Sequence, residues 1–216
     1  MTGSSPIALE NRGQTGARLS SPSAARNREI IAATLAQVLP QDAAVLEIAS
    51  GTGEHALACL SARADLRWQP SDPDPASRAS IDDWASEAAG RMASALDLDT
   101  QHSGWWRAVP RPVSAVFCAN MIHIAPWQAA EGLAEGGAAL LDEGGYLILY
   151  GPFLEGEATA PSNLAFDASL KSRDPRWGVR ALDDVAALMA RHGLVLAQRL
   201  AMPANNLTLV FRKGAP

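Results

Sequence analysis

A glycine-rich turn between a strand and a helix constrains the fold of this chain more than any other segment. Residues 44–49 (AVLEIA) are typical of a buried strand, and residues 53–63 are typical of a helix. The turn between them contains Gly51 and Gly53, which allow backbone angles and a close ligand approach that a Cβ would block. The helix that follows offers free N–H groups to a ligand. The segment therefore predicts a nucleotide-binding α/β domain.

Strand and helix patterns alternate along most of the chain. A first helix is expected to start at Ser21-Pro22 and to end at Pro40. Beyond the glycine-rich turn, the pattern predicts strands at residues 66–69, 94–98, 113–119 and 146–150, and helices at residues 75–88, 127–141 and 183–192. This alternation favours a parallel sheet that is covered by helices on both faces.

The last two strand patterns differ from the others. Leu194 to Met202 and Leu207 to Arg212 are joined by only four residues, whereas a parallel crossover needs a dozen or more. We therefore expect them to form an antiparallel hairpin. Taken together, the patterns predict a Rossmann-like α/β fold with a mostly parallel seven-stranded sheet and a C-terminal antiparallel hairpin.

Length and charge limit the classes of function. The chain has 216 residues and a formal net charge of −5, which makes it a poor electrostatic match for nucleic acid. No apolar run approaches the length of a membrane span. We expect a flexible tail over residues 1–20 and a single cytoplasmic domain over residues 21–216. Cys59 and Cys118 lie among apolar residues and should be buried thiols, and the four scattered histidines do not favour a metal site.

An acidic residue follows the second predicted strand. Asp72 comes about 20 residues after Gly53, the spacing at which a carboxylate accepts hydrogen bonds from ribose hydroxyls in dinucleotide-binding folds. The alternative is that Asp72 only caps the helix that starts near Pro75, because the Ser71-Asp72-Pro73-Asp74 segment is also typical of a helix start.

The turn also fits the glycine pattern of nicotinamide-binding enzymes, since Gly51 and Gly53 are followed by Ala56. Two features speak against that reading. Glu47 lies inside the buried strand, where an ionised carboxylate needs a partner. The expected terminal hairpin is similar to the reversed last strand of class I methyltransferases, in which an acid equivalent to Glu47 belongs to the cofactor motif.

Longer strings resemble one particular family, the methyltransferase-like 26 group, which is also described as a domain of unknown function. The strings are WQPSDPD (68–74), NMIHIAPW (120–127), LYGPF (149–153), APSN (160–163), RDPRWG (173–178) and MPANNL (202–207). The resemblance runs from about Ser21 to Arg212 and implies a class I methyltransferase fold that binds S-adenosyl-L-methionine. It departs at Ala49, where a glycine is common, at Ser114, where an acid is common, and at Ala25, where the family tends to have Glu. The family implies no substrate.

In an open α/β sheet, ligands bind at the carboxyl ends of the strands. The residues expected to bind the cofactor are Glu47, Ala49, Ser50, Gly51, Thr52, Gly53, Asp72, Pro73, Asp99, Asn120 and Met121. Asp99 is the candidate for the adenine amino group. Asp97 replaces it if the strand register is shifted by two, because side chains alternate along a strand.

Methyl transfer requires alignment of donor and acceptor and sometimes removal of a proton, so no fixed catalytic triad is expected. His123 is a candidate general base, and Tyr150 a candidate for lining the acceptor site. Both have a structural alternative: a histidine bonded to the loop backbone, or a buried tyrosine with one hydrogen bond. The candidates for substrate contacts are Arg26, Asn27, Asn163 and Trp177. With the resemblance, Arg26 and Asn27 are also candidates for closing over the carboxylate of the cofactor, and an exposed polar helix face is the alternative. For Asn163 and Trp177 the alternative is a surface helix whose Arg–Asp pairs contribute little.

These observations favour a methyltransferase that uses S-adenosyl-L-methionine and acts on a small molecule. A non-catalytic protein that binds the same cofactor for assembly is a second hypothesis, and a nicotinamide-dependent oxidoreductase is a third. The sequence indicates neither the acceptor atom nor the oligomeric state.

Overall fold

A computed structural model describes residues 11–215 of the chain, which form two compact units. Of the described residues, 11–43 and 49–98 form one unit, and 44–48 and 99–215 form the other. Within the described residues the main sheet has six strands, five of which belong to the second unit. The fold is α/β, as expected, but the predicted seven-stranded sheet was wrong by one strand.

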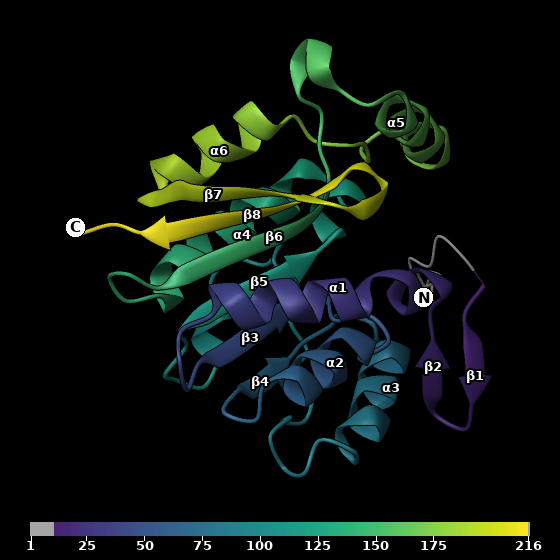
Figure 1. Ribbon diagram of the computed structural model, residues 1–216, viewed down its shortest axis with the longest axis vertical. Helices are drawn as coiled ribbons and strands as arrows, with labels where there is room; N and C mark the ends of the chain where they lie inside the picture. Colours follow the sequence, from purple (N-terminus) through teal and green to yellow (C-terminus); the bar gives the residue numbers. More distant parts are fainter. Residues whose placement is uncertain (1–10, 216) are drawn as a thin grey trace. The chain divides into compact units, whose positions relative to one another are not determined.

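The first unit combines a small hairpin, three helices and one strand of the main sheet (Figure 1). Its elements are β1 (Gly13–Thr15), β2 (Arg18–Ser20), α1 (Pro22–Val38), α2 (Glu54–Ala62), β4 (Arg67–Pro70) and α3 (Pro75–Ala85). The predicted start of α1 is confirmed: the Ser21 side chain accepts a hydrogen bond from Ala24 N–H at 3.1 Å, and Pro22 is the first helical residue. Helices α1 and α2 pack side by side.

The strand predicted at residues 94–98 does not form. Around this segment the chain makes two isolated parallel bridges, one from Met92 to Trp68 in β4 and one from Leu96 to Ser71 just after β4. Between these bridges Pro70 has no N–H to continue the ladder, and the Ala95 N–H donates to Asp82 Oδ1 at 2.8 Å instead. The backbone pairing is therefore interrupted after one bridge, and a regular strand is lost.

A hairpin occupies part of the segment that was expected to be a flexible tail. Strands β1 and β2 pair antiparallel, with Gly13 opposite Ser20 and Thr15 opposite Arg18. Residues 1–10 lie outside the described residues. The tail and the single domain over residues 21–216 stay predictions.

The described residues of the second unit hold the remaining strands of the main sheet and three α-helices. Its elements are β3 (Ala44–Ile48), β5 (Ala115–Ala119), α4 (Trp127–Leu140), β6 (Tyr146–Pro152), α5 (Pro161–Arg173), α6 (Leu182–Arg191), β7 (Leu194–Met202) and β8 (Asn206–Lys213). The strand order is β3-β5-β6-β8-β7. Strands β3, β5 and β6 are parallel, while β8 is antiparallel to both β6 and β7, so the predicted terminal hairpin is confirmed. Figure 1 shows α6 lying along β7.

Glycines in α4 let a loop lie close against the helix. A Cβ built on Gly132 would lie 1.8 Å from Thr100 O, and one on Gly136 would lie 2.4 Å from the Trp105 ring. The Trp105 indole N–H donates to Gly132 O at 2.9 Å. Gly132 and Gly136, which should weaken a helix by propensity alone, are thus required by packing. No helix in the described part of the chain is long and apolar enough to cross a membrane.

Candidate functional site

The glycine-rich turn of the first unit is a backbone loop with several left-handed residues. Ala49, Gly51 and Gly53 have φ values of +55°, +61° and +96°. The loop is tied to the end of β4, because Ser50 N–H donates to Ser71 O at 2.8 Å and Ser71 N–H donates to Ser50 Oγ at 3.1 Å. This pairing fixes the loop next to the residues that follow β4.

The two glycines serve different purposes. A Cβ on Gly53 would lie 3.0 Å from Ile81 Cα, so this glycine permits the close approach of α3. A Cβ on Gly51 would meet, within 4 Å among the described residues, only the Arg12 guanidinium, at 3.8 Å from Nη2. Gly51 therefore presents its backbone to a space that no other described residue fills within that distance.

Asp72 is bonded to the glycine loop. Its Oδ2 accepts from Gly51 N–H and its Oδ1 from Asp74 N–H, both at 2.9 Å. The residue that caps α3 is Asp74, whose side chain accepts from Ala76 and Ser77 N–H. The capping role considered for Asp72 therefore belongs to Asp74. Asp72 is only 7% exposed, and burial raises its pKa to about 6. Each of its oxygens still has a lone pair for a ligand hydroxyl.

A second carboxylate, Glu54, joins the loop to the segment before α1. Its Oε2 accepts from Ser21 N–H at 2.7 Å and from the Thr52 hydroxyl at 2.8 Å, and its Oε1 accepts from Arg28 at 3.1 Å. The residue is buried. Glu54 was absent from the predicted site, although an acid in the first turn of a helix is a recognised stabilising position.

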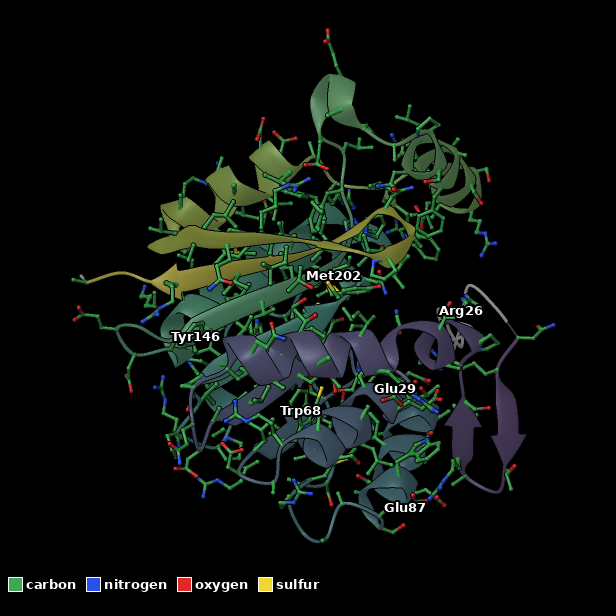
Figure 2. All side chains as sticks on the ribbon, in the orientation of Figure 1. Arg26, Glu29, Trp68, Glu87, Tyr146 and Met202 are labelled. Atoms are coloured by element: carbon green, nitrogen blue, oxygen red, sulfur yellow. The ribbon has the colours of Figure 1, made fainter. Side chains whose placement is uncertain are left out.

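The predicted pair on α1 has other partners. Arg26 is exposed on α1 (Figure 2), and its Nη2 donates to Ser23 Oγ at 2.9 Å. The Asn27 side chain contacts the His55 ring, with Oδ1 2.9 Å from Nε2. Burial, together with the charge of Arg28, lowers the pKa of His55 to about 4. Their role in substrate binding stays a prediction.

In the second unit, the loop after β5 carries Asn120, Met121 and His123. Asn120 has φ +61°, its N–H donates to Tyr150 O at 2.8 Å, and its carbonyl accepts from His123 N–H. His123 is 1% exposed, and its Nδ1 accepts from the backbone N–H of Arg180 at 3.2 Å. The Nε2 atom must then carry the ring proton. Burial and the nearby charge of Arg180 lower the pKa of His123 to about 3.

The Nε2 atom of His123 is the one buried side-chain nitrogen or oxygen in the described chain that has no hydrogen-bond partner. It faces Gly151, where a Cβ would lie 2.7 Å away. A general base needs a free lone pair, whereas here the Nδ1 lone pair is occupied and Nε2 carries the proton. This bonding fits the structural alternative for His123.

Arg180 holds the His123 loop and was not singled out from the sequence. Its side chain donates to the carbonyls of Ile122 at 2.8 Å and of Ala125 at 2.7 Å. Its guanidinium also lies 5.6 Å from the centroid of the Trp127 ring. The position of Arg180 just after the RDPRWG string was a signal that could have drawn attention to it. Its contacts with backbone carbonyls, however, could not be predicted from the sequence.

Asn163 joins three segments of the chain through hydrogen bonds. It is buried, and its Nδ2 donates to Phe153 O at 3.2 Å and to Asn205 O at 3.0 Å. Tyr150 is buried within β6, and Trp177 is partly exposed in the turn after α5. The substrate roles proposed for these residues stay predictions.

The remaining predicted residues differ in burial and in hydrogen-bond partners. Glu47 is buried in β3. Asp99 accepts from Gln101 N–H at 2.9 Å and so caps a turn. Asp97 is exposed and pairs with Arg78 at 3.1 Å. The Pro73 carbonyl accepts from Arg78 at 2.8 Å. Cys59 and Cys118 are buried and form no disulfide among the described residues, and burial raises the pKa of the Cys118 thiol to about 12.

The structure thus gathers one set of predicted residues in the first unit, namely Ala49, Ser50, Gly51, Thr52, Gly53, Asp72 and Pro73. A second set, Asn120, Met121 and His123, is gathered in the second unit. The sequence matches the family described as protein of unknown function, DUF938, over residues 18–213. The chain belongs to that family. The finer methyltransferase-like 26 assignment remains a proposal.

Several solved structures that are similar to this DUF938 chain are named as methyltransferases. An O-methyltransferase family protein from Burkholderia thailandensis has a TM-score of 0.74 at 14% identity, over 89% of this chain and 57% of its own. An O-methyltransferase family 2 protein from Planctomyces limnophilus, in complex with apigenin, has a TM-score of 0.72 at 20% identity, over 88% and 60%.

The S-adenosylmethionine-dependent methyltransferase SibL has a TM-score of 0.73 at 17% identity, over 89% of this chain and 56% of its own. The chain therefore spans less than two thirds of each of these three relatives. At these identities, the likeness establishes that the fold resembles that of S-adenosylmethionine-dependent methyltransferases.

Proposed function

We propose that this protein is a methyltransferase of the methyltransferase-like 26 group that binds S-adenosyl-L-methionine and methylates a small molecule. The observation that carries the proposal is the bonding of Asp72 to the glycine loop. A buried carboxylate at the end of β4, held by Gly51 N–H at 2.9 Å, has the position and the free lone pairs that a ribose diol requires.

The direction of the terminal strands supports this function over a nicotinamide-dependent oxidoreductase. Strand β8 is antiparallel to β6 and β7, whereas dinucleotide dehydrogenases usually continue parallel. The similarity to methyltransferase folds supports the same choice.

The cofactor would supply a methyl group on a positively charged sulfur. The residues of the first unit that fit it are Asp72, which accepts from the ribose, and Gly51, which leaves its backbone uncovered. In the second unit, His123 keeps the loop at Asn120 and Met121 in place through its bond with Arg180. On this proposal His123 positions that loop and does not remove a proton from the acceptor.

The test is calorimetric titration with S-adenosylhomocysteine, S-adenosylmethionine and, as a control ligand, NADH. The proteins are wild type, Asp72→Asn and the matched variant Asp74→Asn, which removes a neighbouring charge but retains a good helix cap. Asp72→Asn should weaken adenosyl binding roughly tenfold to a hundredfold, because a charged acceptor is lost. Asp74→Asn should bind as wild type does.

Thermal unfolding of both variants establishes that each is folded at the titration temperature. Binding of NADH without adenosyl ligands would favour an oxidoreductase. Adenosyl binding that is equal in Asp72→Asn and wild type would show that Asp72 does not hold the ribose. Binding of none of the three ligands would contradict the proposal as a whole.

A further inference from the structure

The segment before α1 is attached to α3. We call residues 11–21 the strap. In the strap, Leu19 N–H donates to Ser80 Oγ at 2.8 Å, and the Trp84 indole donates to Leu19 O at 3.0 Å. Arg18 lies 4.0 Å from the Trp84 ring centroid and pairs with both Asp83 and Glu87. In Figure 2, Glu87 is labelled just beyond the end of α3. The strap is therefore held in place by several side chains at once.

The strap is also bonded to the glycine loop. Ser21 N–H donates to Glu54 Oε2, which accepts from the Thr52 hydroxyl as well. Gly13 lies opposite Ser20, so the residue before β1 is brought back beside Ser21 and this bond. That residue is Arg12.

Arg12 directs its guanidinium at the loop. Its Nη1 donates to Ser77 Oγ at 3.2 Å, and Ser77 Oγ donates to Asp74. Its Nη2 lies 3.8 Å from the point where a Gly51 Cβ would stand, and its charge acts to lower the pKa of Asp72. None of the ion pairs found among residues 11–215 includes Arg12.

Among the described residues, the Arg12 guanidinium thus lies beside backbone that no other residue covers and has no carboxylate partner. Such a guanidinium is suited to an anionic ligand group, since its planar donors match a carboxylate. We propose that Arg12 binds the carboxylate at the amino-acid end of the adenosyl cofactor and that the strap is part of the cofactor site. This inference rests on the proposed function. It gives Arg12 the contact that the sequence suggested for Arg26.

The experiment compares two ligands that differ in the proposed contact. S-Adenosylhomocysteine carries the amino-acid end, and 5′-methylthioadenosine lacks it while retaining the adenosine and the sulfur. Dissociation constants of both are measured by calorimetry for wild type, Arg12→Gln, Arg12→Lys, Arg26→Gln and the control Arg67→Gln. Arg67 is exposed on β4, so its substitution removes the same charge from the same unit.

Arg12→Gln should weaken S-adenosylhomocysteine binding about tenfold to a hundredfold and leave 5′-methylthioadenosine binding unchanged. Arg12→Lys should recover part of the loss, because it retains the charge but not the planar pair of donors. Arg67→Gln should bind both ligands as wild type does.

Equal weakening of both ligands in Arg12→Gln would overturn the proposal and leave a purely structural role for the strap. Weaker binding of S-adenosylhomocysteine in Arg26→Gln, with unchanged binding in Arg12→Gln, would also overturn the proposal. It would assign the cofactor carboxylate to Arg26 on α1. If wild type binds neither ligand, it is the proposed function that fails. If wild type binds both equally well, the cofactor site stands and only the carboxylate contact is disproved.

Discussion

Asp72 accepts a hydrogen bond from the backbone N–H of Gly51 at 2.9 Å, so the residue proposed to bind ribose also fixes the loop that would surround the ligand. A substitution at Asp72 therefore acts on the loop as well as on the ligand. Lowering the pH protonates Asp72 but leaves its side chain in place, so it disturbs the loop less than a substitution does.

Affinity for S-adenosylhomocysteine should depend on pH through Asp72. The pKa of this carboxyl is raised to about 6 by burial, and ribose hydroxyls donate best to the ionised form. Affinity should be constant above about pH 7 and should fall below pH 6, by up to about tenfold per pH unit. Titrations at pH 5 to 8 measure this, and the dependence should vanish in Asp72→Asn. A flat profile in wild type would contradict the ribose role.

Ala49→Gly should stabilise the protein. Ala49 has φ +55°, a left-handed conformation that costs a residue with a Cβ about 1–2 kcal/mol. Glycine removes that strain, but the greater conformational freedom of the unfolded chain costs about 0.5–1 kcal/mol. The free energy of unfolding should therefore rise by about 0.5–1 kcal/mol. Urea unfolding of the two proteins gives the difference directly. The analogous change at Ala56, a buried position within α2, should destabilise instead.

The His123 ring should stay neutral at pH values far below the ordinary histidine pKa of about 6.5. Its folded pKa is lowered to about 3, so the unfolded state binds the proton first. The neutral ring contributes stability that is fully present above about pH 6.5 and is lost as pH falls toward 3, by up to about 1.4 kcal/mol per pH unit. Urea unfolding at pH 7 and pH 5 should show a smaller loss in His123→Gln than in wild type.

Nitrogen-15 spectra of the imidazole ring provide an independent check, since they distinguish the two tautomers. The proton should be on Nε2, because Nδ1 accepts from Arg180 N–H. A ring that titrates near pH 6.5 would restore the general-base hypothesis.

Asn163→Ala should lower stability without changing affinity for S-adenosylhomocysteine. The substitution removes the amide that donates to the Phe153 and Asn205 carbonyls. Phe153 is buried, and a buried acceptor that loses its partner costs about 1–3 kcal/mol. The control is Asn206→Ala, because the Asn206 amide makes only exposed bonds to Pro203 and Ala204. Its effect should stay within about 0.5 kcal/mol. An unchanged stability in Asn163→Ala would argue for a role in substrate binding.

Local patterns were sufficient to predict most elements of this fold. The cap at Ser21 and Pro22, the glycine loop and the antiparallel terminal hairpin all follow from signals within a few residues. The strand at residues 94–98 failed for a reason outside its own sequence: the partner strand has Pro70 where the ladder needs an N–H. Tertiary context decided that element.

The candidate site was predictable in part, from the same kind of local pattern. The residues of the glycine loop and Asp72 are adjacent in the structure because Ser50 of the loop and Ser71, the residue before Asp72, are hydrogen-bonded to each other. Arg12 was missed because a segment rich in glycine and serine was interpreted as loose. The signal that was available is Gly16 between two short polar runs, which is typical of a hairpin turn.

The order of strands in the second unit has a consequence for synthesis on the ribosome. Strand β8 lies between β6 and β7, yet it is made after both. Until residues 206–213 leave the ribosome, β7 has no strand to pair with and β6 has only β5. The nascent chain thus presents an unpaired edge on β6 and a wholly unpaired β7 until β8 emerges, and such open edges promote aggregation.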